Sequence, residues 1–316
     1  MPDFDGLRIA AIVPCYNEEV AIAEVVESLR AAIPSMDVYV YDNNSKDATA
    51  DRARAAGAIV RFEGRQGKGN VIRRAFADVD ADVYVLIDGD ATYDAAALPE
   101  MVNALLDGPL DHVLGVRREV EGSAYRPGHA LGNKMFNRLV SGLFGEPVTD
   151  MLSGFRVFSR RFIKSFVAES SGFETETELT IHAMNLRVPQ VEVPVGFRDR
   201  PAGSESKLRT YHDGFRILGL IATLIRIERP RVFFLIWTFL FAIVGVAIGI
   251  PVIVEFAQTG LVSKLPSAVL AVGFVLLAAL ALVLGFIMTA LKRSRDELKR
   301  LTYLSYPPTI RSARAR

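Results

Sequence analysis

The chain has 316 residues, with 37 lysines and arginines against 36 aspartates and glutamates. This length allows a sizeable core and more than one domain, and a near-zero net charge gives no support to a nucleic-acid-binding protein. The single cysteine, Cys15, excludes an internal disulfide and is consistent with a reducing compartment. It follows an apolar run, so we expect it to pack rather than to react.

Strand and helix patterns alternate along the first 200 residues. Apolar runs typical of strands occupy residues 8–14, 38–41, 59–62, 83–87, 112–116, 157–158 and 190–197. Helical patterns occupy about 17–32, 49–56, 71–79, 95–106, 131–144 and 174–186, with Asn17 expected to cap the first. The acids at the start of the last helix, within 174–178, suit its dipole. The alternation predicts an α/β fold with a Rossmann-like, mostly parallel sheet.

Two carboxylates, Asp88 and Asp90, end the strand at 83–87 and are separated by one glycine. A strand buried on both faces opens at the carboxyl edge of a parallel sheet, where such sheets bind ligands. Two carboxylates there repel each other unless a cation joins them, and a hard ion such as Mg²⁺ or Mn²⁺ suits them. The alternative is a solvated turn, since aspartate and glycine are common turn residues.

Glycines and a lysine in the segment 64–70 offer a second anion-binding candidate. The segment lacks the spacing of a Walker A loop, and no Gly-x-Gly-x-x-Gly follows the first strand, so neither nucleotide fingerprint is present. Flexible backbone with Lys68 beside a helix start suits a diphosphate. An ordinary basic turn is the alternative.

Two C-terminal stretches, 232–254 and 265–291, contain no charged side chain. Each is longer than the roughly 20 residues needed to cross a bilayer core. Arginines precede the first stretch, and basic residues follow the second in the tail 292–316, so the positive-inside rule places the N-terminal domain and the tail in the cytoplasm. We expect a multi-pass protein of a cell inner membrane, with no signal peptide in the short polar start.

The segment joining the domain to these spans has apolar residues at helical spacing. Residues 211–227 therefore predict an amphipathic helix in the plane of the bilayer surface, or alternatively one packed on its own domain. The expected domains are 1–210, 211–230, 231–291 and 292–316. The oligomeric state stays open, although Gly245 and Gly249 form a small-residue pair that lets helices approach, including those of a homo-oligomer.

Several motifs occur together in one order: Pro14-Cys15-Tyr16-Asn17-Glu18, an aspartate-rich loop from Asp42, the Asp88-Gly89-Asp90 pair and Ser153-Gly154-Phe155-Arg156. Together they resemble family 2 glycosyltransferases, and more narrowly the polyprenyl-phosphate sugar transferases, over about residues 8–230. The resemblance implies a GT-A fold, a divalent Mg²⁺ or Mn²⁺ and a nucleotide-sugar donor: UDP-glucose, UDP-N-acetylglucosamine or GDP-mannose. The implied acceptor is a polyprenyl phosphate in the lipid bilayer.

The resemblance also implies roles for single residues. Asp88 and Asp90 would hold the metal, and the donor pocket would be lined by Pro14, Tyr16, Glu18, Asp42, Lys68 and Asp88. Phosphates, above all that of the acceptor, would be held by Arg117, Arg156, Arg200, Ser206 and Lys207. Asp150, Arg156 and Arg200 are the candidates for catalysis, with Asp150 as a base or positioning group. One departure is Ala91-Thr92-Tyr93, where dolichol-phosphate-mannose synthases commonly carry a glutamine, which leaves the third metal ligand and the sugar open.

Two other functions share these features. A processive polysaccharide synthase would keep the donor site, but such enzymes carry a Gln-x-x-Arg-Trp motif, and the only tryptophan here, Trp237, lies in a predicted span. A non-catalytic, membrane-anchored nucleotide-sugar-binding protein would keep the fold alone. The expected reaction is transfer with inversion, in which an α-linked donor gives a β-linked lipid.

Overall fold

A computed structural model describes residues 4, 6–119, 149–168, 170, 174–200 and 226–309. The chain divides into two compact units, one of residues 1–206 with 299–316 and one of residues 207–298. The helices predicted at 131–144 and 211–227 fall wholly or mostly outside the described residues, as do Ser206 and Lys207.

The first unit is built on a seven-stranded sheet in the order β3-β2-β1-β4-β6-β5-β7. All neighbours pair in parallel except β6, which runs antiparallel to both β4 and β5. The prediction of a mostly parallel sheet is therefore confirmed. The strands are β1 (Ile9–Cys15), β2 (Asp37–Asp42), β3 (Ile59–Phe62), β4 (Val83–Leu86), β5 (His112–Glu119), β6 (Arg156–Ser159) and β7 (Gln190–Phe197).

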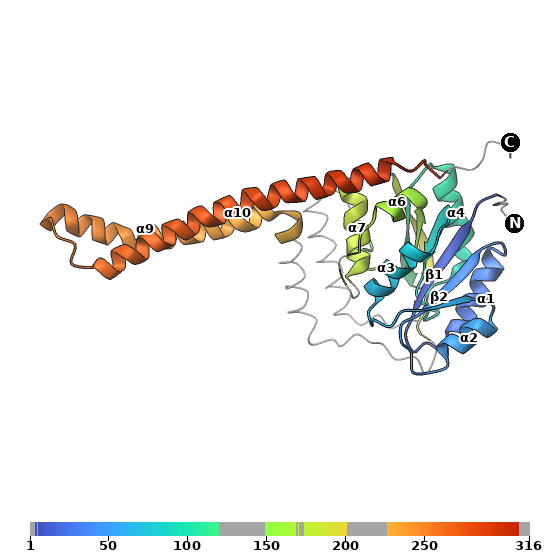
Figure 1. Cartoon of the computed structure of the whole chain (residues 1–316). Helices are drawn as coiled ribbons and strands as arrows, with labels where there is room; N and C mark the ends of the chain where they lie inside the picture. The colour runs from blue at the N-terminus through green and yellow to red at the C-terminus, as the bar shows by residue number, and fades with distance from the viewer. Residues whose placement is uncertain are drawn as a thin grey trace. The chain divides into compact units, whose positions relative to one another are not determined.

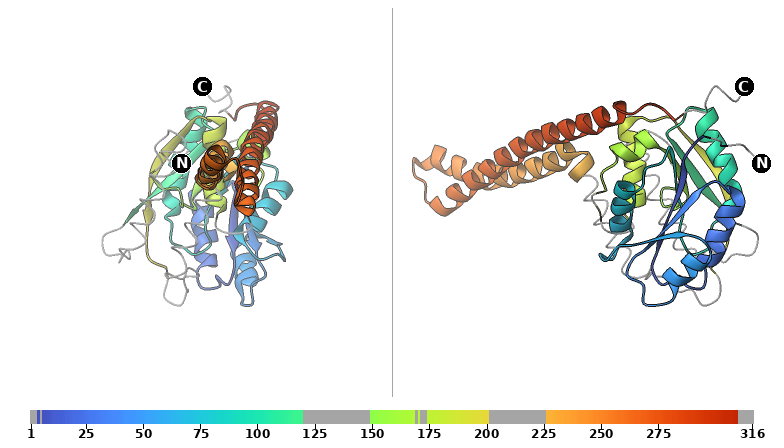
Figure 2. Two further views of the ribbon diagram at one scale, coloured as in Figure 1. Left: turned by 90° about the vertical axis from the view of Figure 1, so that its left-hand side faces the viewer. Right: turned by 45° about the vertical axis from the view of Figure 1, so that its right-hand side comes forward.

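Helices cover both faces of this sheet (Figure 1, Figure 2). One face carries α1 (Ile22–Ala32), α2 (Thr49–Ala55) and α4 (Leu98–Asp107), which follows the short 3₁₀ helix η1 (Ala95–Ala97). The other face carries α3 (Lys68–Asp78), α6 (Arg160–Ser165) and α7 (Thr175–Leu186). The crossover helices between parallel strands place one layer on each side, as expected for a doubly wound sheet.

The central strands supply both cores with alternate side chains. On β4, Val83 and Val85 face the α1–α4 layer, while Tyr84 and Leu86 face the α3–α7 layer, and all four are fully buried. A strand buried on both faces has a continuous apolar sequence, which is why the run at 83–87 was recognisable.

The position of β1 marks the candidate ligand-binding edge of the sheet. After β1 the chain builds β2 and β3 on one side, and it later returns to place β4 on the other side. The carboxyl ends of β1 and β4 thus diverge at a topological switch point, where open α/β sheets bind ligands. The turn containing Asp88 and Asp90 follows β4 at this edge.

The end of α10 (Leu265–Leu304) belongs to the first unit, where it contacts the sheet domain near Asp111. The Tyr303 hydroxyl donates to Oδ2 of Asp111 (2.7 Å), a carboxylate with no exposed surface. Arg161 donates to both oxygens of Asp111 (2.5 and 2.6 Å), and its guanidinium lies 4.6 Å from the centre of the Tyr303 ring. A buried carboxylate with three such donors fixes the chain end to the domain.

The second unit consists mainly of two apolar helices, α9 (Pro230–Thr259) and the first part of α10 (Leu265–Leu304). Each is long and apolar enough to cross a membrane, with mean hydropathy of 2.6 and 2.9 over the most apolar windows. Both exceed the predicted spans, and α10 continues into the basic tail. There Lys292–Asp296 and Arg293–Glu297 pairs at i,i+4 spacing support the helix.

Small residues bring these two helices together. A Cβ on Gly245 would lie 3.2 Å from the Ala271 carbonyl, and one on Gly249 would lie 3.5 Å from the Ala271 side chain. Gly285 of α10 is equally close to Phe234 of α9, at 3.0 Å. The predicted small-residue pair at 245 and 249 therefore serves the contact within the hairpin itself.

Candidate active site

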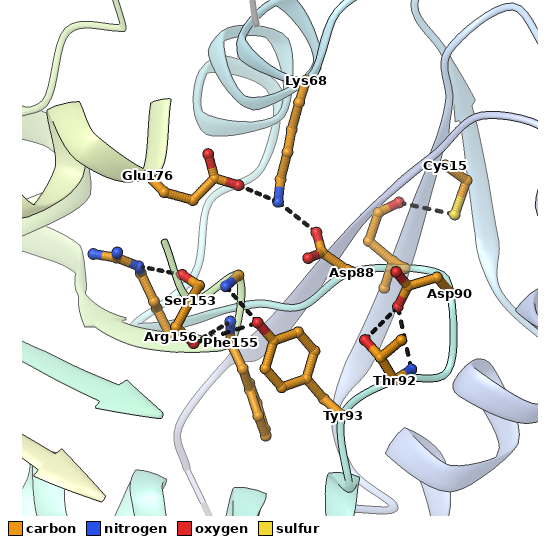
Figure 3. A network of polar contacts seen from close by, with 12 residues as sticks. Cys15, Lys68, Asp88, Asp90, Thr92, Tyr93, Ser153, Phe155, Arg156 and Glu176 are labelled. Carbon is orange, nitrogen blue, oxygen red and sulfur yellow. Dashed lines mark hydrogen bonds and ion pairs between the residues drawn. The ribbon is translucent and has the colours of Figure 1, made fainter. Parts of the chain in front are cut away.

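The turn after β4 carries both carboxylates (Figure 3), which differ in their exposure. The Asp88 side chain is 29% exposed, whereas that of Asp90 is 9% exposed. Oδ1 of Asp90 accepts hydrogen bonds from the Thr92 hydroxyl (2.6 Å) and the Thr92 backbone N–H (3.2 Å). Ala91 between them has a φ of 56°, a backbone conformation that L-residues rarely adopt and that ordered contacts must hold.

Two glycines make room for this turn. A Cβ at Gly154 would lie 2.2 Å from Oδ2 of Asp88, and a Cβ at Gly89 would lie 2.4 Å from the sulfur of Cys15. No side chain fits at either position without displacing its neighbour. Cys15 is buried against the Asp88-Gly89-Asp90 turn, which confirms packing as its structural environment.

Each of the two carboxylates is paired with a cation of the chain. Lys68, at the start of α3, forms ion pairs with Asp88 and with Glu176 of α7. Arg200 donates to Oδ2 of Asp90 at 2.7 Å and lies 3.8 Å from Glu18. Burial alone would lower the pKa of Lys68, but the charges of Asp88 and Glu176 outweigh burial and raise that pKa above its ordinary value.

The carboxylate oxygens of Asp88 and Asp90 are ligand atoms that suit a hard divalent ion. Asp88 and Asp90 offer carboxylate oxygens at one sheet edge, and Gly154 provides the space in which the Asp88 carboxylate sits. Among the described residues, no group of three His, Cys, Asp or Glu side chains converges to hold a metal. Mg²⁺ typically takes only one or two carboxylates and completes its shell with phosphate oxygens and water, so two ligands suffice.

The residues predicted for the nucleoside pocket gather at the ends of β1 and β2. Pro14 lies opposite Tyr41 and Cys15 opposite Asp42 in the parallel register. Glu18 and Asp42 are both 7% exposed, and the Glu18 N–H donates to the Thr49 hydroxyl (2.8 Å). Tyr16, in the same loop, is partly buried. Adjacent strand ends thus bring the predicted residues together.

Asn17 does not cap the first helix, so that prediction was wrong. The helix begins at Ile22, with no side-chain cap. Asn17 instead has a φ of 53°, accepts a hydrogen bond from the Lys46 N–H (2.8 Å) and donates its own N–H to Ser45 (3.0 Å). It ties the loop after β1 to the loop after β2, a long-range role that local spacing does not reveal.

Asp150, which is buried, and Arg117, which is partly buried, form one ion-paired unit. Arg117 Nε and Nη2 donate to the two carboxylate oxygens of Asp150 at 2.7 and 2.6 Å, and the Arg117 N–H adds a third bond at 3.2 Å. The Asp150 side chain is 7% exposed and that of Arg117 is 21% exposed. This fork orients the guanidinium at the carboxyl end of β5.

Arg156 is fully buried and braces the loop that precedes β6. Its three guanidinium nitrogens donate to the Ser153 carbonyl (2.9 Å), the Thr180 hydroxyl (2.9 Å) and the Met151 carbonyl (2.7 Å). Burial, together with the charge of Arg117, lowers the pKa of Arg156 to about 10, even though Glu176 and Asp150 oppose the shift. Contact with a phosphate, which the sequence analysis predicted, would require this side chain to give up these partners.

Two residues near the carboxylates were not predicted. The Tyr93 hydroxyl accepts a hydrogen bond from the Gly154 N–H (2.8 Å), and burial together with Asp88 raises the Tyr93 pKa to about 12. Glu176 pairs with Lys68. Residues two apart differ by about 200° around a helix, so the acids at 174, 176 and 178 cannot all face solvent. The two-residue spacing of these acids could therefore have predicted that one of them points toward the interior of the domain.

The comparisons with known proteins agree with this geometry. Residues 10–166 match the family model described as "Glycosyl transferase family 2". A dolichyl-phosphate hexose transferase of Haloferax volcanii is 32% identical over 230 residues, covering 72% of this chain and 97% of that protein. Glycosyltransferase AglJ of the same organism is 29% identical over 307 residues, covering 96% of this chain and 100% of that protein.

A solved structure shares the fold. Glucosyl-3-phosphoglycerate synthase from Mycobacterium tuberculosis, in complex with Mn²⁺ and UDP-glucose, superposes with a TM-score of 0.56 at 26% identity, over 70% of this chain and 78% of that one. The GT-A fold expected from the sequence is thereby confirmed. The paired carboxylates at the switch point, the family match and these relatives lead to one conclusion: the chain belongs to glycosyltransferase family 2.

Proposed function

We propose that this chain transfers a hexose or N-acetylhexosamine from a nucleotide sugar to a polyprenyl phosphate, with inversion at the anomeric carbon, in the assembly of cell-envelope glycans. The observation that carries the proposal is the Asp88–Asp90 pair at the sheet edge, in a chain 32% identical to a dolichyl-phosphate hexose transferase. The candidate donors are UDP-glucose, UDP-N-acetylglucosamine and GDP-mannose. UDP-glucose bound with Mn²⁺ in the M. tuberculosis synthase supports this class of donor.

Donor binding is assigned to the ends of β1, β2 and β4. Pro14, Tyr16, Glu18 and Asp42 would line the nucleoside pocket, while Asp88 and Asp90 would hold Mg²⁺ or Mn²⁺ against the diphosphate. The ion would neutralise the charge that develops on the leaving diphosphate. Lys68, which contacts Asp88, would supply a second positive charge at the same oxygens.

The bond changes are those of a single displacement. An oxygen of the lipid phosphate forms a bond to the anomeric carbon, the bond from that carbon to the diphosphate oxygen breaks, and its electron pair leaves with the nucleoside diphosphate. A phosphate monoester has a second pKa of about 6, so near pH 7 it is mostly a dianion and already nucleophilic. The reaction therefore needs orientation of the acceptor more than a strong base.

Orientation of the acceptor is assigned to cations at the carboxyl edge. Arg117 is held by Asp150, which gives Asp150 a positioning role. Arg200, paired with Asp90, lies beside the metal ligands. Arg156 would act through the loop that it braces, and Ser206 and Lys207 stay predictions for the acceptor phosphate, outside the described residues.

The apolar hairpin suits a lipid acceptor. A prenyl chain leaves the bilayer only at a cost of about 0.8 kcal/mol per exposed CH₂, so a membrane-bound enzyme has to reach the lipid at the interface. The helices α9 and α10 supply membrane association. We infer that the catalytic domain faces the cytoplasm, where nucleotide sugars are made.

A donor panel tests the proposal. Membranes containing the chain are incubated with undecaprenyl phosphate, Mn²⁺ and each of the three donors, carrying a radiolabelled sugar. We expect label in a lipid that mild acid releases, from one donor above the others, and none in parallel samples treated with EDTA. Label in a polymer would instead identify a polysaccharide synthase. Donor binding without transfer would identify a non-catalytic binding protein.

A further inference from the structure

A buried carboxylate on α7, Glu176, has no role in the assignments above. It is 4% exposed and lies in the first turn of the helix. One oxygen pairs with Lys68, while Oε2 is buried without a hydrogen-bond partner among the described residues. Buried carboxylates are normally fully bonded, so a half-bonded one calls for an explanation.

Glu176 lies close to two cationic side chains, those of Lys68 and Arg156. The Lys68 side chain is 7% exposed and contacts Glu176 and Asp88 at the same time (Figure 3). The charge of Glu176 also acts on the buried guanidinium of Arg156. In addition, the N-terminal turn of a helix favours an anion. Lys68 therefore pairs with two carboxylates. Only one of them, Asp88, belongs to the proposed metal-binding pair.

We propose that Glu176 is a positioning residue that holds Lys68 beside the donor diphosphate while Asp88 ligates the metal. An ammonium that left Asp88 without a second carboxylate would be a largely buried, unpaired charge, which is strongly destabilising. Because Glu176 keeps that ammonium paired, Asp88 is free to exchange its partner. This inference rests on the proposed function, and in particular on Asp88 as a metal ligand.

If Glu176 positions Lys68 in this way, substitutions of Glu176 and of Lys68 should change the affinity for Mn²⁺ in opposite directions. In Glu176→Gln, Asp88 becomes the only carboxylate left to Lys68, so Asp88 has to break a stronger ion pair before it can ligate a metal. We expect the Kd for Mn²⁺ without nucleotide to rise at least about tenfold, the usual scale for groups that orient a ligand. In Lys68→Met that competition is absent, so Mn²⁺ binds more tightly than in the wild type, while UDP binds the Mn²⁺-loaded protein more weakly.

A double-mutant cycle separates this role from a simple loss of negative charge. The full chain in detergent is titrated with MnCl₂ by electron paramagnetic resonance, in the wild type, both single variants and the double variant. We expect Glu176→Gln to lose its effect in the Lys68→Met background. If the two substitutions are instead additive, Glu176 acts on the metal by distant electrostatics and the inference is wrong.

Glu178→Gln is the matched control, because Glu178 lies on the same helical turn but accepts its hydrogen bond from the Ser170 N–H (2.8 Å). Its Mn²⁺ affinity should equal that of the wild type. Should Glu176→Gln fail to fold, Lys68→Met still decides, since weaker Mn²⁺ binding in that variant contradicts the proposal. A wild type that binds no Mn²⁺ would overturn the metal assignment together with this inference, whereas an additive cycle would overturn the inference alone.

Discussion

At the scale of single residues, two neighbouring carboxylates at the sheet edge are each stabilised by an ion pair. Asp88 and Asp90 follow one buried strand, and each pairs with a cation from a distant segment: Lys68 from α3 and Arg200 from the segment after β7. In each pair one side chain is less than 10% exposed, so removing its partner would leave a largely buried charge uncompensated. The cations therefore matter for the fold of the turn as well as for the diphosphate.

Asp90 offers the most direct test of the metal assignment. In Asp90→Ala we expect transfer to fall by at least about a hundredfold with any added divalent metal, because a metal contributes several kcal/mol of charge stabilisation. The measurement is the initial rate of labelled lipid formation. The matched control is Asp78→Asn, which removes an exposed carboxylate paired with Arg74. Full turnover in Asp90→Ala, with the control unchanged, would mean that Asp90 is not a metal ligand.

Among the elements, β5, β6, α6 and α7 share an aromatic layer that contains two buried histidines. His112 stacks on Phe158 with ring centres 5.1 Å apart, and the His182 ring meets Phe162 edge to face at 5.0 Å. Nδ1 of His112 contacts Gln190 (3.0 Å) and Nε2 of His182 contacts Ser165 (2.9 Å). Neutral rings suit this packing, since protonation would bury a charge among phenylalanines.

This layer predicts a loss of stability in acid. Burial, and then the charge of Arg156, lowers the pKa of His112 to about 3, while burial and Lys299 lower that of His182 to about 3. The unfolded chain takes up these protons below about pH 6.5, whereas the folded chain does not. The stabilisation is therefore complete above about pH 6.5 and falls as the pH drops toward 3, by at most about 1.4 kcal/mol per pH unit for each histidine.

The measurement is the free energy of unfolding of the first unit in urea, followed by pulse proteolysis between pH 7 and pH 4. In His112→Gln and His182→Gln the pH slope should be smaller than in the wild type, even where stability at pH 7 is lower. An unchanged slope in both variants would show that carboxylates alone carry the acid sensitivity.

At the scale of the whole molecule, membrane topology is the main open prediction. By the positive-inside rule, arginines before α9 and basic residues in the second half of α10 predict that both helix ends lie on the cytoplasmic side, with only a short loop at residues 260–264 across the bilayer. This orientation would put the domain that holds Asp88 and Asp90 on the side where donors are available.

Cysteine labelling tests this topology. In intact spheroplasts a membrane-impermeant maleimide should label Ser263→Cys but not Lys46→Cys, and both once the membrane is opened. These two positions are exposed, whereas the native Cys15 is 2% exposed and provides a low background. Labelling of Lys46→Cys in intact spheroplasts would reverse the proposed orientation.

Local patterns in the sequence determined the strands, the parallel sheet, the two apolar helices and the residues at the strand ends. These features depend on short-range periodicity, and the carboxyl ends of parallel strands necessarily meet at one edge. The Asp88–Asp90 pair was visible for this reason. The family motifs then assigned the neighbouring residues to a donor pocket.

Only the tertiary structure decided which charges meet. Lys68 is 20 residues from Asp88 and 108 from Glu176, and neither spacing says that one ammonium joins both. The resemblance assigned Arg156 to a phosphate, and the structure shows that each of its guanidinium nitrogens donates to its own loop or to α7. Asn17 joins two loops instead of capping a helix. Ion pairs and buried hydrogen bonds depend on the packing of distant segments, and no local periodicity encodes that packing.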